Sequence, residues 1–146
     1  MGGIVSTIYP ILSIVISTSF SSCELHIRKT KSIPRLSDFL IGSILGAGNF
    51  GRIREIRRET DGKWFGMKEF DLLSLTSTKD AEIIVNELEC LKRFSQNTPP
   101  HPHLLQFYAS FRESHYIYFI TALYHGGDLR MSYRLGEKYN EEKTAY

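Results

Sequence analysis

The feature that most constrains the fold is a run of three glycines in the stretch Leu45-Gly46-Ala47-Gly48-Asn49-Phe50-Gly51-Arg52-Ile53. Glycines at this spacing let a turn of backbone approach an anion closely and direct its N–H groups at it. Several nucleotide-binding folds and plain glycine turns share the pattern, so it does not identify a function by itself. Two later residues strengthen it: Lys68 lies fifteen residues after Ile53, and Glu87 lies nineteen residues after Lys68.

The glycines can lead either into a helix or into the second strand of a hairpin. A dinucleotide-binding fold needs a helix directly after them, within a parallel crossover of about a dozen residues or more. Only residues 52–59 precede Thr60-Asp61-Gly62, a length of about 12 Å if helical. The Asp-Gly turn therefore favours a returning strand. Ile53 and Ile56 are three residues apart, so periodicity alone does not exclude the helix.

Length, charge and cysteine content limit the class of protein. The 146 residues are enough for one domain with a hydrophobic core. A formal net charge of +2 indicates no polyanion partner, so we expect no nucleic acid. Cys23 and Cys90 form neither a disulfide framework nor a metal-ligand pattern, which favours a reducing compartment. His101 and His103 lack further ligands at usable spacing, so we predict no metal site.

Residues 1–37 are predicted to form an apolar segment and a linker ahead of a domain over residues 38–146. Residues 1–23 carry no charge, but serines, threonines and Pro10 dilute their hydrophobicity, so a membrane span is marginal. The basic start of a secretory signal is missing. Gly2 fits the N-myristoylation pattern, and basic residues up to Arg35 can add a membrane contact through residues 1–35. Either anchor leaves the domain cytoplasmic; an extra terminal segment without such a role is the alternative.

Two segments bring Lys68 and Glu87 into one argument. Residues 64–70 are predicted to form a strand on which Gly66 and Lys68 share a face, which leaves room for a flat ligand. Residues 80–96 have a helical pattern, with an apolar side formed by Ile83, Ile84, Leu88, Leu91 and Phe94. Glu87 lies within this stripe, where a carboxylate needs a partner, and Lys68 is the best-placed base. The alternatives are a solvated lysine and a glutamate at the stripe's margin.

The order of these features resembles the N-terminal lobe of a eukaryotic protein kinase. The glycine turn, Lys68 and Glu87 are followed by His101-Pro102-His103, two predicted strands (104–111 and 116–122) and Gly126-Gly127-Asp128-Leu129. The last motif, with Asn140-Glu141-Glu142, is most similar to AGC-type serine/threonine kinases, including the YANK group. The resemblance implies an α+β small lobe: about five antiparallel strands with one main helix, then the hinge and the start of the large lobe.

The resemblance also implies an ATP site. Gly46, Gly48 and Gly51 would cover the phosphates, and Lys68 would hold them while paired with Glu87. The remaining implied contacts are Ala47, Asn49, Phe50 and Arg52 in the glycine turn; Leu45 and Ile53 around the adenine; Thr121 behind it; the backbone of Ala122 and Tyr124 at its edge; and Asp128 at the ribose, or only as a helix cap. Gly66 replaces the family's usual alanine, so the adenine loses some packing.

Two motifs of a complete kinase, the His-Arg-Asp catalytic loop and the Asp-Phe-Gly metal site, are missing from the sequence. No histidine precedes an arginine, and the one Asp-Phe pair, Asp38-Phe39, stands before the glycine turn and is followed by leucine. Phosphoryl transfer needs those groups and Mg²⁺, so we expect the 146 residues alone to be inactive, with weak ATP affinity and Mg²⁺ bound only in a complete domain. Expected partners are ATP and a protein substrate or partner kinase. The alternatives are a non-catalytic interaction module, a non-functional fragment and, third, a nucleotide-binding oxidoreductase fragment.

Overall fold

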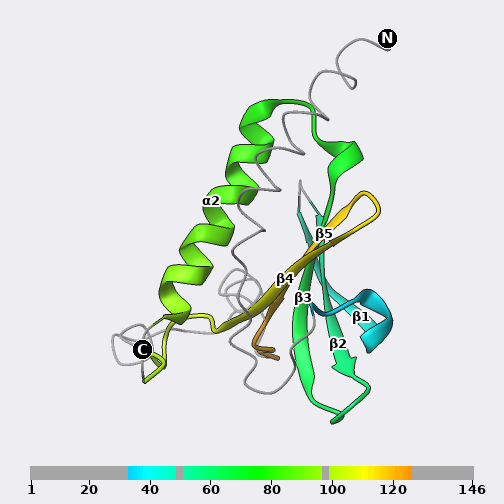
Figure 1. Ribbon diagram of the computed structural model, residues 1–146, viewed down its shortest axis with the longest axis vertical. Helices are drawn as coiled ribbons and strands as arrows, with labels where there is room; N and C mark the ends of the chain where they lie inside the picture. Colours follow the sequence, from blue (N-terminus) through cyan, green and yellow to red (C-terminus); the bar gives the residue numbers. More distant parts are fainter. Residues whose placement is uncertain (1–32, 49–50, 97–98, 126–146) are drawn as a thin grey trace, which may run out of the picture.

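The structure, a computed structural model, describes residues 33–48, 51–96 and 99–125. Five strands and one long helix make up most of it (Figure 1). The strands are β1 (Phe39–Gly48), β2 (Gly51–Arg58), β3 (Trp64–Asp71), β4 (Phe107–Glu113) and β5 (Tyr116–Thr121). The helix is α2 (Thr78–Ser95), and two short 3₁₀ turns are η1 (Leu36–Asp38) and η2 (Leu72–Ser74).

The strands form one sheet in the order β1-β2-β3-β5-β4, and each neighbouring pair is antiparallel. The glycine run therefore lies at the end of a hairpin, with Gly48 opposite Gly51. This confirms the returning strand and rules out the crossover helix of a dinucleotide fold. The small-lobe architecture that the resemblance implies, a five-stranded antiparallel sheet with one main helix, is also confirmed. The Gly126-Gly127-Asp128-Leu129 and Asn140-Glu141-Glu142 motifs lie outside the described residues.

The Asp-Gly turn between β2 and β3 closes as its sequence predicts. Gly62 has a φ of 68°, in the left-handed region that glycine adopts without strain. The Arg58 amide donates to the carbonyl of Lys63 across the turn at 2.8 Å. The Arg58 guanidinium also donates to the Asp61 carboxylate, and this hydrogen bond lowers the pKa of Asp61 to about 2.

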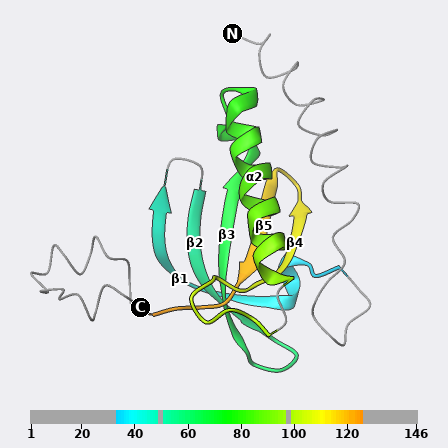
Figure 2. The same cartoon turned by 90° about the vertical axis from the view of Figure 1, so that its left-hand side faces the viewer.

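Helix α2 covers one face of the sheet (Figure 2), which we call the inner face. Ser77 is its N-cap and forms a reciprocal capping box with Asp80, so the helix begins two residues earlier than the predicted start at residue 80. Its buried residues are Ala81, Ile84, Leu88 and Leu91. They pack with Phe70, Phe107, Ile117 and Phe119 from the sheet, and this cluster attaches the helix that carries Glu87.

The predicted apolar side of the helix is wider than the side that packs. Ile83 and Phe94 were expected on it, but they are 46% and 43% exposed. At about 100° per residue, Ile83 lies about 100° from Ile84 and Phe94 about 60° from Leu91, both on the edge of the helix that also carries Glu87. The sheet therefore packs only against the centre of the stripe.

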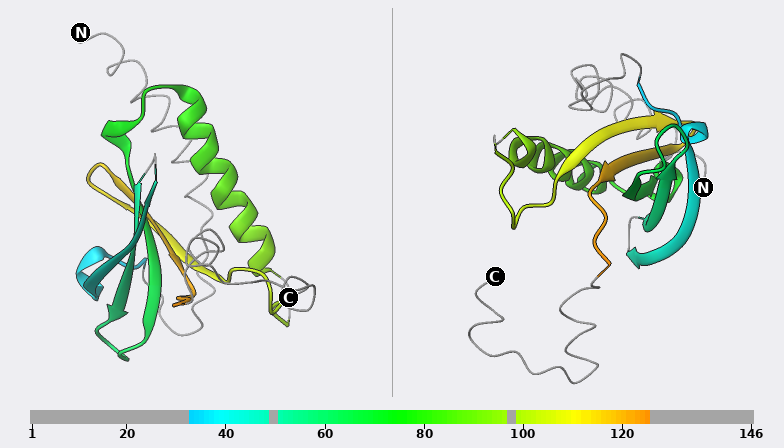
Figure 3. Two further views of the ribbon diagram at one scale, coloured as in Figure 1. Left: turned by 180° about the vertical axis from the view of Figure 1, so that it is seen from behind. Right: turned by 90° about the horizontal axis from the view of Figure 1, so that it is seen from below.

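The opposite, outer face of the sheet has its own core. It is formed by Phe39, Ile56, Phe65, Met67, Ala109, Phe111, Tyr118 and Ile120, with Leu36 packed against it. Figure 3 shows η1 on this side, across the sheet from α2. The Leu36 amide donates to the Glu113 carboxylate at 3.0 Å, which attaches η1 to the end of β4. Among the described helices, none has the length and hydrophobicity to span a membrane.

Candidate nucleotide site on the inner face

Lys68 and Glu87 meet at the inner face, between β3 and α2. The Lys68 ammonium donates to both oxygens of Glu87, each at 2.7 Å. It also lies 4.8 Å from the centre of the Phe70 ring, a cation–π contact. This is the pairing that the helical pattern predicts. The two side chains remain 33% and 32% exposed, so the ammonium is held in place while an anion can still approach it.

The strand register places the glycine hairpin beside this ion pair. Ile53 is directly opposite Lys68, and Gly46 is opposite Ile53. Cross-strand partners share a face, so Ile53 lies on the inner face and is 41% exposed. Leu45 falls at a break in the β1–β2 register and is 46% exposed. Ile53 is thus an exposed apolar side chain directly across from a cation, and Leu45 is exposed on the neighbouring strand.

Gly66 and Thr121 form the next row of the same face. They are opposite each other on β3 and β5. A Cβ at Gly66 would lie 3.2 Å from the Thr121 hydroxyl and 3.3 Å from the Ala122 carbonyl oxygen. The glycine therefore belongs to a tight junction between β3 and the segment after β5, in addition to widening the face as the sequence suggests.

The segment after β5 offers backbone groups to this region. The Ala122 amide donates to the Gln106 carbonyl at 2.8 Å, which fixes the backbone of residue 122. Of this residue's two backbone groups, only the carbonyl can therefore serve a ligand. The Tyr124 side chain is 62% exposed. Sequence reasoning missed Gln106, because a backbone acceptor sixteen residues away leaves no local signal.

Not every predicted site residue faces the ion pair. Arg52 lies on the outer face, where its Nε is 2.7 Å from a Glu69 oxygen, so only its backbone can take part on the inner side. Ala47 is opposite Arg52 and shares that orientation. Asn49, Phe50, Asp128 and Gly2 lie outside the described residues. Sequence reasoning also missed Glu69, although strand alternation places it opposite in direction to Lys68.

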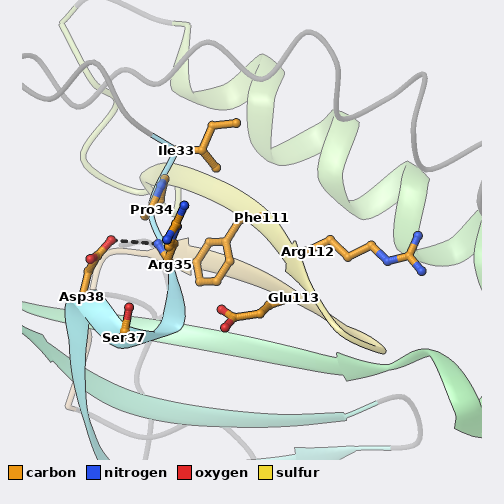
Figure 4. A pocket seen from close by; sticks show the side chains of 8 residues that line it. All are labelled: Ile33, Pro34, Arg35, Ser37, Asp38, Phe111, Arg112 and Glu113. Atoms are coloured by element: carbon orange, nitrogen blue, oxygen red, sulfur yellow. Dashed lines mark hydrogen bonds between the residues drawn. The ribbon is translucent and has the colours of Figure 1, made fainter.

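A cavity of about 930 Å³ lies elsewhere, where residues 33–38 meet the end of β4 (Figure 4). Both of its carboxylates already accept backbone hydrogen bonds: Asp38 from Arg35 at 2.8 Å and Glu113 from Leu36 at 3.0 Å. None of its lining residues belongs to the inner-face constellation. The cavity therefore adds nothing to the candidate site, despite its size.

A family model described as "Protein kinase domain" matches residues 39–145. Curated proteins with similar sequences include the "RAC family serine/threonine-protein kinase homolog" of Dictyostelium discoideum, 24% identical over 76% of this chain. The "cAMP-dependent protein kinase type 3" of Saccharomyces cerevisiae is 27% identical over 79% of it, and the mouse "Serine/threonine-protein kinase Nek2" is 30% identical over 71%. The chain spans 24%, 28% and 23% of these three relatives, about a quarter of each.

Proposed function

Since the chain belongs to the protein kinase family, we propose that its described residues form the ATP-binding lobe of a serine/threonine protein kinase. The observation that carries the proposal is the Lys68–Glu87 ion pair on the inner face, beside the glycine hairpin. A lysine held by a glutamate presents a fixed positive charge, and phosphate oxygens are the ligand class that such a charge recognises. Transfer of the γ-phosphoryl group to protein hydroxyls is the activity we propose for the complete domain.

Each part of the inner face has a role in this proposal. Backbone N–H groups of Gly46, Gly48 and Gly51 cover the phosphates, and Lys68 contacts them from the sheet. Exposed Leu45 and Ile53 pack on the adenine from above. At the far edge, Thr121 limits the depth of the adenine site. The Ala122 carbonyl and the Tyr124 amide bond the adenine edge, and the Ala122–Gln106 hydrogen bond keeps that carbonyl in position.

Protein kinases act with Mg²⁺ bound to the nucleotide. Within residues 33–48, 51–96 and 99–125, no group of three or more His, Cys, Asp or Glu side chains could hold a metal ion. In the complete domain, magnesium would reach this lobe as part of the nucleotide complex, where it neutralises phosphate charge. We propose that the 146 residues alone bind nucleotide weakly and transfer no phosphoryl group, because the groups that orient the substrate hydroxyl are not in the sequence.

The finer assignments are also proposals. Gly126-Gly127-Asp128-Leu129 supports an AGC-like kinase, within which the YANK group fits the N-terminal pattern. Myristoylation of Gly2, with the basic residues up to Arg35, would hold a cytoplasmic domain at a membrane. Mass spectrometry of the N-terminal peptide from eukaryotic cells tests the lipid: a mass increase of one myristoyl group supports it, and an unmodified or acetylated glycine contradicts it.

Nucleotide binding tests the central proposal. Displacement of a fluorescent ATP analogue by ADP should be saturable, and Lys68→Met should weaken ADP at least about tenfold, because charge-assisted contacts contribute about 1.5–3 kcal/mol. Lys79→Met is the matched control, since Lys79 is an exposed lysine on the first turn of α2. Absence of binding, or equal affinity in both variants, would contradict the proposal and favour a non-catalytic interaction module.

A further inference from the structure

Behind the proposed phosphate site, the outer face carries a second charged cluster. Glu69 follows Lys68 on β3, but alternation directs its side chain to the other side of the sheet. It is 8% exposed, which is unusual for a carboxylate. The same oxygen, Oε1, lies 2.7 Å from Arg52 Nε and 3.1 Å from Arg54 Nε. We call these three side chains the outer bracket.

The outer bracket is aligned with the ion pair on the inner face. Arg52 and Arg54 flank Ile53, and Ile53 is directly opposite Lys68. One carboxylate on β3 thus holds β2 on both sides of the residue that faces Lys68. β2 and β3 are also in close contact here, since a Cβ at Gly51 would lie 1.8 Å from the Glu69 carbonyl oxygen.

The charges of the bracket exceed what neutralisation requires. A single arginine balances a carboxylate, yet two contact this one. The side chains of Arg52 and Arg54 are 46% and 22% exposed, so the second arginine does not serve to fill the hydrophobic core. Tyr118 faces Glu69 from β5, and burial together with the Glu69 charge raises the pKa of its phenol. The two contacts with Glu69 therefore fix the position of β2, beyond neutralising the carboxylate.

We propose that Glu69, Arg52 and Arg54 are positioning residues that hold β2, and with it Gly51 and the Gly48 opposite it, at a fixed height over Lys68. The bracket never touches the nucleotide. It acts through the β2–β3 spacing, so it affects phosphate contacts and leaves the adenine edge at residues 122–124 unchanged. This inference rests on the proposed nucleotide site for its consequence, but the mechanical claim about β2 stands without it.

Arg52→Gln is the variant of choice, because its half-exposed side chain can be replaced with less risk to folding than Glu69. Arg57→Gln is the matched control: it removes one exposed arginine from the same strand, whose contacts with the Gly62 carbonyl and the Trp64 ring lie at the other end of β2, away from the bracket. Amide hydrogen exchange on the full nucleotide-free chain should rise about fivefold at residues 46–48 and 51–54 in Arg52→Gln, given a contact of about 1 kcal/mol. Arg52→Lys, which keeps the charge, should restore most of the protection.

Measurements of nucleotide binding distinguish a positioning role from a general loss of stability. ADP affinity should fall about fivefold in Arg52→Gln and adenosine affinity by less, because adenosine has no phosphate and meets β2 only through Ile53. Exchange equal to that of Arg57→Gln, or an equal rise along α2, would overturn the bracket. Equal losses for ADP and adenosine would overturn its role at the phosphates. If wild type binds neither compound, the proposed function fails, and the exchange data alone decide whether the bracket holds β2.

Discussion

Breaking the Lys68–Glu87 ion pair should reveal how strongly β3 and α2 are coupled. At an effective dielectric constant of about 20, unit charges at the observed 2.7 Å attract by roughly 6 kcal/mol. Most of this is offset by lost hydration and by ordering two long side chains, and one third of each remains exposed to screening water. We therefore expect a net coupling of about 1 kcal/mol, decreasing in about 1 M salt because the pair is partly screened.

A double-mutant cycle measures this coupling. Lys68→Met, Glu87→Gln and the double variant are unfolded with urea, and the free energies of unfolding are compared at low and high salt. Each single variant should lose more free energy of unfolding than the removed side chain contributes by itself, because it leaves a partly buried charge without its partner. Additivity within about 0.3 kcal/mol would refute the reasoning, since it would mean that the contact contributes nothing to joining helix and sheet.

Three further predictions follow from the packing and the turns. Gly51→Ala should lower the free energy of unfolding in urea by about 2–4 kcal/mol, since the added methyl group would lie 1.8 Å from a carbonyl oxygen. Gly48→Ala should lower it by less than about 1 kcal/mol, because a methyl group there has nothing within 4 Å. Leu88→Ala should lower the free energy of unfolding by about 2–5 kcal/mol, against below about 1 kcal/mol for Ile83→Ala, because Leu88 is fully buried and Ile83 is 46% exposed; similar losses would contradict the assigned helix face. The pKa of Asp61 is about 2 in the folded chain and near 3.8 in the unfolded chain, so its stabilisation is present above pH 3.8 and is lost as the pH falls toward 2. Asp61→Asn should therefore make the free energy of unfolding less dependent on pH between pH 3.8 and 2. The same pH dependence in the variant and the wild type would contradict the assignment.

Features with a local signal could be predicted from the sequence. The hairpin follows from its Asp-Gly turn, because a two-strand return needs few residues and a characteristic φ at Gly62. The Lys68–Glu87 contact follows from a carboxylate in an apolar stripe, which must find a cation. Both depend on chemistry that neighbouring residues already fix.

Features that depend on register could not be predicted. The orientation of Arg52 toward Glu69 requires knowing that Gly51 is opposite Phe70, and the irregular apolar spacing of β2 does not determine this. The Ala122–Gln106 hydrogen bond joins backbone groups and leaves no trace in residue types. The exposure of Ile83 and Phe94 depends on how far the sheet reaches around the helix, which periodicity does not report.

The most direct test of the account is an NMR titration of the full ¹⁵N-labelled chain with ADP, with adenosine as the reference. We predict saturable shifts for both ligands at Ile53 and at residues 122–124, and shifts at Gly46, Gly48 and Gly51 for ADP alone. A folded, well-dispersed spectrum that ADP leaves unchanged would contradict the central claim. So would saturable shifts confined to the cavity around Phe111 and Glu113.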